Sequence, residues 1–313
     1  MTQDRTLEDW ARAAAAGDRT AAERLLGALQ NGLYRLALRM LGHPEDAEDA
    51  TQEILLIVLT HLGSFRGDSS FRTWSWRIAA NHLLRVRRGR MERFTFESIT
   101  AVLEAGLRDE EPDLLEAEAS LFAREVRLRC TQAMVLSLDR DLRIAFVLGD
   151  IFCLTGEEAA RVLDVDAATY RKRLSRARTR LLAFLRARCG LFDASNGCRC
   201  TRQIASARER GLLRPDELLF ARHPVEESRE DVDAAVAPPL ERCRLEVDEL
   251  LRLGEVIRHP EFTAPPGLLP RIRGLLDSGR FALFALDRRS RSEDGERREP
   301  YPPRPAERGK TVS

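Results

Sequence analysis

Apolar residues recur at spacings of three and four through the first half of the chain, and this pattern most constrains the fold. It forms the stripes Leu33, Leu36, Ala37, Met40, Leu41 and Ala47, Ala50, Ile54, Val58, Leu62, and Phe71, Trp74, Ile78 continue it. Residues at this spacing share one face of an α-helix. We therefore expect an all-α fold, with three or four helices over about residues 4–92 and breaks at 42–44 and 63–70.

A second helical unit is expected from about residue 120 to residue 188. The preceding residues 97–118 carry eight acidic side chains against one arginine and contain Pro112. Such a segment buries little apolar surface, so residues 96–119 are predicted to form an extended or partly ordered acidic linker. An acidic surface helix is the alternative, and helix is expected within residues 113–129.

The second unit contains the pattern of a helix-turn-helix. Thr155 is a candidate N-cap with Glu158 as its capping-box partner, residues 164–165 form the turn, and Asp166 can cap a second helix that runs to about Leu185. That helix carries six basic residues, Arg171, Lys172, Arg173, Arg176, Arg178 and Arg180. This face can bind DNA phosphates and insert a side chain into the major groove; a solvated basic helix is the alternative.

The first unit has an acidic helix followed by an aromatic loop. Acids in a first helical turn favour the helix dipole, which accounts for Asp46 and Glu48. It does not account for Asp49, Gln52 and Glu53, which share an outward face and indicate a docking surface for a basic partner.

A polar loop bounded by aromatics, residues 64–71, then leads into a helix with Trp76, Arg77 and Asn81, and a basic patch at residues 85–90 follows. Rings beside basic residues suit unpaired DNA, because bases stack on rings while cations neutralise the backbone. Trp74 shares a stripe with core residues, so Phe65, the loop and Asn81 are better candidates for base contacts.

These segments resemble a known family. Asp46-Ala-Glu-Asp-Ala-Thr-Gln-Glu53, Phe65-Arg-Gly-Asp-Ser69 and Thr73-Trp-x-x-Arg-Ile-Ala-x-Asn81 resemble conserved region 2 of the extracytoplasmic-function sigma factors, and Thr169-Tyr-Arg-Lys-Arg-Leu-Ser-Arg-Ala-Arg178 resembles their region 4. The resemblance covers roughly residues 20–188. It implies region 2 over residues 1–95, the linker over 96–119, region 4 over 120–188, an extension over 189–286 and a disordered tail over 287–313.

The resemblance also implies a role for each motif. The clamp helices of the largest RNA polymerase subunit would bind Asp46, Glu48, Asp49, Gln52 and Glu53. The −10 promoter element would be melted and captured by Phe65, Arg66, Ser69, Ser70, Trp76, Arg77 and Asn81. The −35 element would be bound by Thr169, Arg171, Lys172, Arg173 and Arg176. Two departures are Ser75-Trp76, where the family commonly has Leu-Tyr, and Tyr170, where a valine is usual.

The extension holds a cysteine cluster. Cys189, Cys198 and Cys200 could bind Zn²⁺ with His223 or Cys243 as a fourth ligand, although the spacing is not that of paired C-x-x-C motifs. The alternatives are a redox pair activated by neighbouring arginines, or ordinary reduced cysteines. Cys130 and Cys153 lie in apolar helical contexts and are expected in the core.

Further along, short helices are expected at about 201–210 and 240–253. Residues 268–286 are amphipathic, and they either fold back onto the sigma-like units or form the extension's own core; in the first case the extension is a candidate regulator in cis.

Composition narrows the function classes. The 313 residues carry a net charge of +1, and neither an apolar run long enough to span a membrane nor a secretion signal is found. A cytoplasmic location is therefore expected, with cysteines free, metal-bound or redox-active rather than in structural disulfides. No phosphate-binding glycine loop or hydrolytic triad is present, which argues against an enzyme and a required cofactor. We expect RNA polymerase core and promoter DNA as partners, no membrane, and an anti-sigma protein as a candidate. A conventional DNA-binding regulator would need only the helix-turn-helix.

Overall fold

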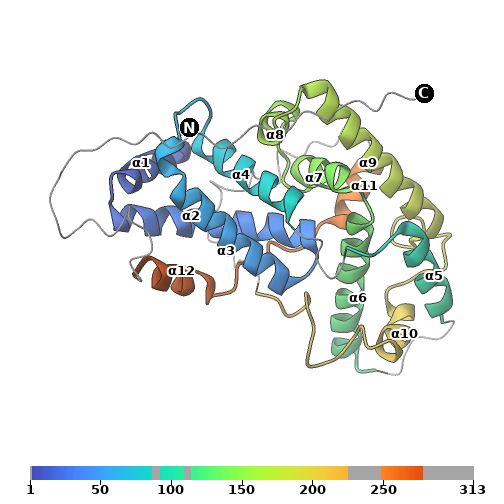
Figure 1. Cartoon of the computed structure of the whole chain (residues 1–313). Helices are drawn as coiled ribbons and strands as arrows, with labels where there is room; N and C mark the ends of the chain where they lie inside the picture. Colours follow the sequence, from blue (N-terminus) through green and yellow to red (C-terminus); the bar gives the residue numbers. More distant parts are fainter. Residues whose placement is uncertain (1, 87–91, 109–113, 225–247, 278–313) are drawn as a thin grey trace, which may run out of the picture.

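The N-terminal unit consists of four helices. The computed structural model describes residues 2–86, 92–108, 114–224 and 248–277. In Figure 1 this unit forms the left half, with helices α1 (Thr2–Ala15), α2 (Arg19–Leu41), α3 (Pro44–Thr60) and α4 (Phe71–Arg85). Gly42 ends α2 in the left-handed conformation, and Pro44 begins α3, as the sequence break at 42–44 predicted.

The segment expected as an extended linker contains a helix. Residues Phe96–Gly106 form α5, which Thr95 and Ser98 close with a reciprocal capping box. The prediction of extended chain is therefore wrong for these residues, and the alternative of a surface helix holds. The helix expected within residues 113–129 is confirmed as the start of α6 (Glu116–Leu136).

The second unit has the predicted helix-turn-helix. After α7 (Arg140–Phe146) and a π-helical turn, η2 (Val147–Ile151), helix α8 (Gly156–Leu163) is followed by α9 (Ala167–Arg188). Thr155 and Glu158 form the capping box of α8, and the carboxylate of Asp166 accepts the N–H of Thr169 to cap α9. Asp164 takes the left-handed conformation between the helices, with φ 54°. The caps and the turn predicted from the sequence are confirmed.

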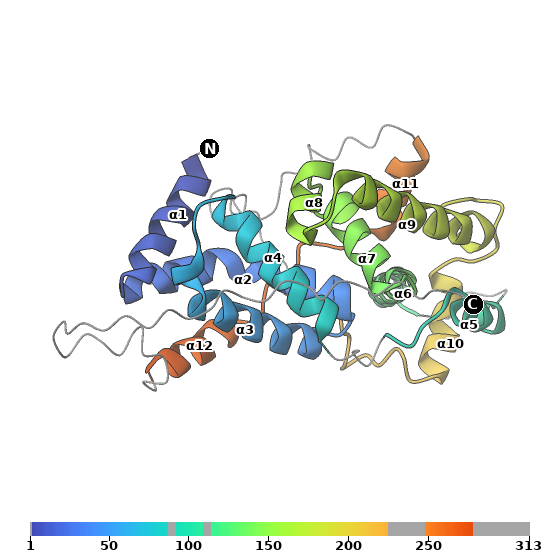
Figure 2. The same cartoon turned by 45° about the horizontal axis from the view of Figure 1, so that its top comes forward.

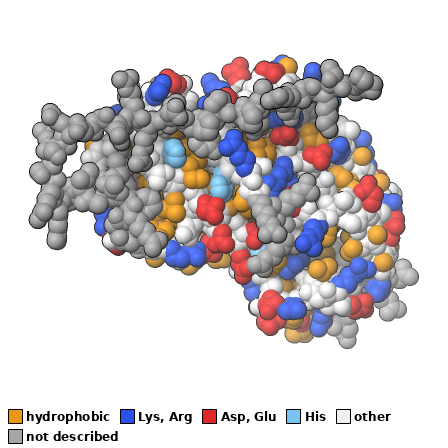
Figure 3. Space-filling view, viewed as in Figure 1, with side chains coloured by type: hydrophobic (Ala, Val, Ile, Leu, Met, Phe, Trp, Pro, Cys, Tyr) orange, Lys and Arg blue, Asp and Glu red, His pale blue; other side chains and the backbone are white. Residues whose placement is uncertain are grey.

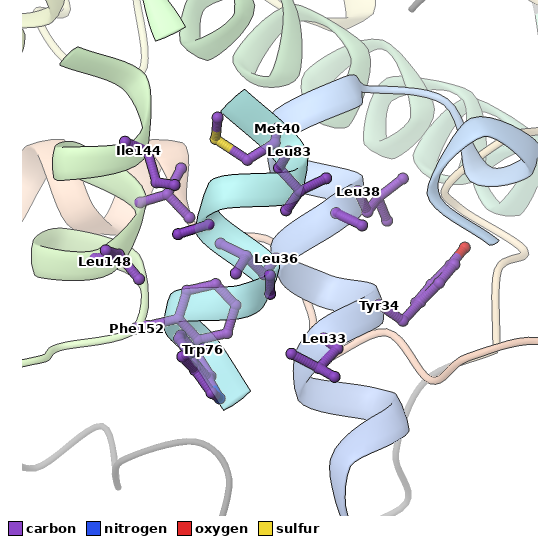
Figure 4. Close-up of a cluster of buried hydrophobic side chains, with 14 of the residues drawn as sticks. Leu33, Tyr34, Leu36, Leu38, Met40, Trp76, Leu83, Ile144, Leu148 and Phe152 are labelled. Atoms are coloured by element: carbon purple, nitrogen blue, oxygen red, sulfur yellow. The ribbon is translucent and has the colours of Figure 1, made fainter. Parts of the chain in front are cut away.

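One hydrophobic core joins the two units. Side chains of α2, α4 and the segment 144–152 meet in it, as Figure 4 shows. Trp76 is 1% exposed, and its ring meets Phe152 edge-on with centroids 4.9 Å apart. The units therefore pack against each other directly.

A buried ion cluster strengthens the same junction. The carboxylate of Glu92 accepts hydrogen bonds from Arg140 (2.9 and 2.5 Å) and from Nη1 of Arg143 (2.5 Å). Arg143 also donates to the carbonyls of Met40 and Leu136 at 2.6 and 2.7 Å. Arg143 thus links the end of α2 to the start of the second unit.

The extension wraps around both units rather than forming a core of its own. Its described helices are η3 (Thr201–Gln203), α10 (Ile204–Glu209), α11 (Asp248–Ile257) and α12 (Leu268–Asp277). In Figures 1 and 2, α12 lies along α3, and α10 lies beside α5 and α6. The buried carboxylate of Glu125 on α6 accepts hydrogen bonds from the N–H groups of residues 219–221 at 2.7–2.9 Å. These bonds hold the segment that follows α10 against α6.

The outcome for the amphipathic stretch is clear. Leu268, Ile272 and Leu276 are buried, and α12 packs on α2 and α3, so the fold-back interpretation is confirmed over residues 268–277 and the alternative of a separate core is wrong there. The helix near 201–210 is confirmed; that near 240–253 is confirmed from residue 248 onward. Residues 240–247 and 278–286 and the predicted tail lie outside the described residues. Within the described part of the chain, no helix is both long and apolar enough for a membrane span.

Candidate polymerase and DNA interfaces

The acidic face of α3 is partly open to solvent. Asp49 and Glu53 are exposed, and Asp46, Glu48 and Gln52 are half-buried. Asp46, Asp49 and Glu53 line one side of a cleft of about 1030 Å³. The other side of the cleft is formed by α7 and residues 92–95. Glu48 is ion-paired with Arg271 of α12, so the extension occupies one edge of this face.

The aromatic loop and α4 are less accessible than expected. Phe65 packs edge-on against Phe71 with centroids 5.1 Å apart, Ser70 caps α4 by accepting the N–H of Thr73, and Arg66 is exposed. Ser69 and Asn81 are half-buried. The structure brings all of these residues to α4 and the loop before it.

Two predicted DNA-contacting residues of α4 instead face the second unit. Trp76 is buried against Phe152, so its ring does not face solvent in this structure. The sequence favoured Trp74 for the core because it shares a stripe with Phe71 and Ile78, whereas the structure buries Trp76 more deeply. Arg77 donates from Nε and Nη2 to the carbonyl of Arg161 at the end of α8, at 3.1 and 2.9 Å.

The basic face of α9 divides into two sets. Arg173, Arg178 and Arg180 pair with acids that precede or lie in α7 and η2, namely Asp141, Asp150 and Asp139. The Arg178 pair is bidentate at 2.6 and 2.9 Å, and this hydrogen bonding raises the pKa of Arg178. Arg171, Lys172 and Arg176 are exposed. The set that pairs internally fixes α9 on the unit, and the exposed set is available to DNA.

Two further residues of α9 are engaged inside the protein. The hydroxyl of Thr169 donates to Asp166 at 2.7 Å, so it supports the cap. Tyr170 is 1% exposed and donates to the carbonyl of Ala145 at 3.3 Å, and a Cβ at Gly149 would come within 2.5 Å of its hydroxyl. The unusual Tyr170 is therefore a core residue and does not contact DNA in this arrangement.

Charges of both signs alternate over the surface. On the face seen in Figure 3, Lys and Arg side chains lie among Asp and Glu side chains rather than in one basic patch. On this face the described residues therefore form no single basic patch, in agreement with the small net charge of the whole chain.

The cysteines do not form the expected metal centre. Cys189, Cys198 and Cys200 are free, half-buried thiols, and the described residues contain no group of three or more His, Cys, Asp or Glu side chains placed to hold a metal ion. His223, a proposed fourth ligand, bonds to the hydroxyl of Tyr34 at 2.6 Å instead. Cys243 lies outside the described residues. Within the described residues, the structure therefore gives no support for a Zn²⁺ site.

The thiols are also poorly suited to redox activation. Burial raises the pKa of Cys198 and, to about 12, that of Cys200, and this effect exceeds the lowering by Arg199 and Arg127. The guanidinium of Arg199 donates to the carbonyls of Ala194, Asn196 and Cys198.

The two cysteines expected in the core have different outcomes. Cys130 is a free, half-buried thiol whose pKa is raised by burial and, to a smaller extent, by the nearby thiols of the extension. Cys153 is 7% exposed and disulfide-bonded, so the expectation of reduced cysteines is wrong for this residue.

The fold and these surfaces define a two-module sigma-type transcription initiation factor. Sigma-70 region 2 matches residues 25–93 and sigma-70 region 4 matches residues 128–181. The sigma-H factor of Pseudomonas aeruginosa is 32% identical over 168 residues, 52% of this chain and 84% of that protein. The sigma-E factor of Escherichia coli K12 is 32% identical over 173 residues, 52% of this chain and 85% of that protein.

The chain belongs to the extracytoplasmic-function sigma factors of the sigma-70 family. Sigma factor NccH of Alcaligenes xylosoxydans is 31% identical over 59% of this chain and 97% of its own length. A solved structure of CnrH in complex with the cytosolic domain of CnrY aligns with 27% identity and a TM-score of 0.41, over 58% of this chain and 98% of that one. The protein is thus a promoter-directing subunit for RNA polymerase and not an enzyme, and it needs no cofactor for that function.

Proposed function

We propose that three surfaces of the chain carry promoter-specific initiation. The acidic face of α3 binds the clamp helices of the polymerase, through Asp46, Glu48, Asp49, Gln52 and Glu53. The loop before α4 and α4 itself bind the melted −10 strand, through Phe65, Arg66, Ser69, Ser70, Arg77 and Asn81. The start of α9 binds the −35 element through Arg171, Lys172 and Arg176. Thr169 and Arg173, which are held in place by Asp166 and Asp141, also contact this element. Such a factor acts with RNA polymerase in the cytoplasm.

The extension regulates these surfaces in cis. The observation that carries this proposal is that α12 of the extension covers part of the α3 surface, while a second surface, on α4, is covered by helix α8 of the second unit. Helix α8 lies on α4, where Arg77 binds the carbonyl of Arg161, and α12 lies on α3, where Arg271 pairs with Glu48. A chain in this closed arrangement has to separate its two units before it can reach the −10 and −35 elements together.

The closed arrangement is held mainly by apolar contact. Surface ion pairs such as Arg271–Glu48 contribute only about 0.2–1 kcal/mol each. Burying a Leu or Ile side chain contributes roughly 1.5–3 kcal/mol, and Leu268, Ile272 and Leu276 of α12 are all buried. A single charge placed at Ile272 should therefore displace α12 while leaving the sigma-like units folded.

The proposal is tested by run-off transcription with purified core polymerase and the full chain. Ile272→Glu is expected to increase both core binding and promoter-specific transcript, because the acidic face of α3 becomes fully available. Gly274→Glu is the matched control, since it adds the same charge to the same helix at an exposed position with open space around it. Unchanged core binding in Ile272→Glu would show that α12 does not regulate the factor.

An anti-sigma protein is the second candidate regulator. The cytosolic domain of CnrY binds the aligned sigma factor CnrH. If such a partner acts on this chain, the Ile272→Glu chain would still be inhibited by it, and pull-down from the source cells would recover it with the wild-type chain.

A further inference from the structure

A cavity of about 330 Å³ lies where three parts of the chain meet. Helix α2 contributes Arg35, Leu38 and Arg39, the end of η2 contributes Ile151, and its C-cap contributes Phe152. The extension closes the cavity with residues 258–262. The cavity therefore exists in this form only while the N-terminal unit, the second unit and the extension are packed together.

Cationic side chains dominate the polar lining of this cavity. Three guanidinium groups, those of Arg35, Arg39 and Arg258, face one carboxylate, that of Glu261, which pairs with Arg35 at 2.9 Å. His259 also lines the cavity, and burial together with the charge of Arg39 and Arg127 lowers the pKa of this imidazole well below its ordinary value. The imidazole is therefore neutral, and the lining keeps an excess of positive charge.

Arg39 is the least ordinary of these cations. It is 3% exposed, and it donates from Nη1 to Oε1 of Gln132 at 2.9 Å and from Nη2 to the carbonyl of Ile257 at 2.8 Å. Both acceptors are neutral, and no carboxylate of the described residues pairs with it. Burial lowers the pKa of Arg39 to about 9. A buried charge without a counter-ion is costly, so folded proteins usually supply an opposite charge.

Unused donors point to the same conclusion. Nε of Arg39 and Nε of Arg258 are buried donors that have no hydrogen-bond acceptor within the described part of the chain, and Nδ1 of His259 is also buried without a partner there. Buried polar groups without a partner are few in native proteins, and each calls for an explanation. All three residues line one cavity. A single anion in this cavity could accept hydrogen bonds from donors that come from α2 and from the extension.

We propose that this cavity binds a small phosphate ester. Guanidinium groups match the oxygen geometry and the charge of a phosphate, and they are the side chains that proteins favour for this purpose. The volume exceeds that of a bare phosphate and falls at the lower end of the range for small-molecule sites. Leu38, Ile151 and Phe152 supply an apolar wall for the organic part of the ester.

Binding at this place has a consequence for the sigma factor. Because the lining comes from both units and the extension, the ligand binds the closed arrangement and not the open one. Ligand at a hundred times its dissociation constant would shift the closed-to-open ratio about a hundredfold toward the closed state. This regulatory consequence rests on the proposed function, whereas the site itself rests only on the packing that the structure shows.

The site is tested by calorimetry on the full chain with two probes, phenyl phosphate and inorganic phosphate. Phenyl phosphate is expected to bind saturably and more tightly than inorganic phosphate. In Arg258→Gln, which changes a half-buried lining residue, affinity should fall about tenfold or more. Arg127→Gln is the matched control, because Arg127 also bridges α6 to the extension, through the carbonyl of Glu255, but does not line the cavity.

Three results would overturn the proposal. Absence of saturable binding by both probes at millimolar concentration would mean that the chain itself neutralises the cavity. Equal affinity for the two probes would refute the proposal that the ligand is a phosphate ester and would indicate inorganic phosphate instead. Equal loss in Arg258→Gln and Arg127→Gln would place the anion elsewhere. These outcomes are separate from the Ile272→Glu transcription assay, which can fail or succeed without changing the calorimetry.

Discussion

Replacing Glu92 by Gln should destabilise the junction between the two units more than any exposed ion pair does. The side chain of Glu92 is 2% exposed, and its oxygens accept from two guanidinium groups, those of Arg140 and Arg143. A glutamine keeps the shape but removes the charge, so Arg143, whose side chain is 4% exposed, becomes a buried cation without its counter-ion.

Loss of one partner of a buried pair costs about 3–5 kcal/mol. For a chain of this size each kcal/mol lowers Tm by roughly 2–4 °C, which gives a decrease of roughly 6–20 °C for Glu92→Gln.

The assay is thermal and urea unfolding of the full chain followed by circular dichroism. Glu209→Gln is the control, because Glu209 pairs with Arg108 at 3.0 Å while its side chain is 63% exposed, and this change should cost less than about 1 kcal/mol. If Glu92→Gln unfolds within 1 kcal/mol of the control, the buried cluster does not hold the junction, and the close packing of the two units loses its main polar support.

Three further predictions concern the other surfaces. Arg171→Ala should weaken DNA binding and reduce the slope of its salt dependence by about one phosphate contact. Arg178→Ala should mainly lower the unfolding temperature, because Arg178 pairs with Asp150. If a fluorescence titration gives equal salt slopes for Arg171→Ala and wild type, Arg171 does not contact a DNA phosphate. Glu125→Gln should lower the free energy of unfolding by about 1–3 kcal/mol, since three backbone donors and Arg129 lose their charged acceptor. Limited proteolysis should then cut the variant near residues 219–221. Resistance to the protease equal to that of the wild type would contradict this prediction. Alkylation of Cys200 should be slow at pH 8 and accelerate toward pH 12, because the raised pKa keeps the thiol protonated at lower pH. Mass spectrometry of the labelled peptide measures the rate, and fast labelling at pH 8 would refute the prediction.

Local signals in the sequence predicted the helix-turn-helix closely. The caps at Thr155 and Asp166 and the turn at Asp164 depend on residues within three positions of each other, so their chemistry can be recognised without the fold. The breaks at Gly42 and at the loop before Ser70 were predicted for the same reason.

Contacts between distant residues could not be predicted in this way. Glu92 and Arg143 are 51 positions apart, and Glu125 is 95 positions from Phe220. In the sequence these residues look like ordinary surface charges. Their burial follows from how the two units and the extension pack, and no spacing rule encodes that arrangement.

The local sequence pattern also could not predict which tryptophan of α4 would be buried. The stripe of Phe71, Trp74 and Ile78 predicted Trp74 for the core, whereas the structure buries Trp76 between the units and leaves Trp74 half-buried beside Phe65. The zinc prediction for the cysteine cluster depended on short spacing alone, which brings thiols together without specifying the geometry of metal ligands, and the described residues give it no support.

The most direct test of the account is the distance between the two units in the free chain and in the holoenzyme. Fluorophores on unnatural side chains at Thr60 and Thr179, which are both exposed, would report the separation of α3 from α9 by energy transfer. The account predicts a short distance in the free chain and a clearly longer one when core polymerase is added. An unchanged distance in a holoenzyme that still starts transcription at its promoter would contradict the closed state as the regulated form.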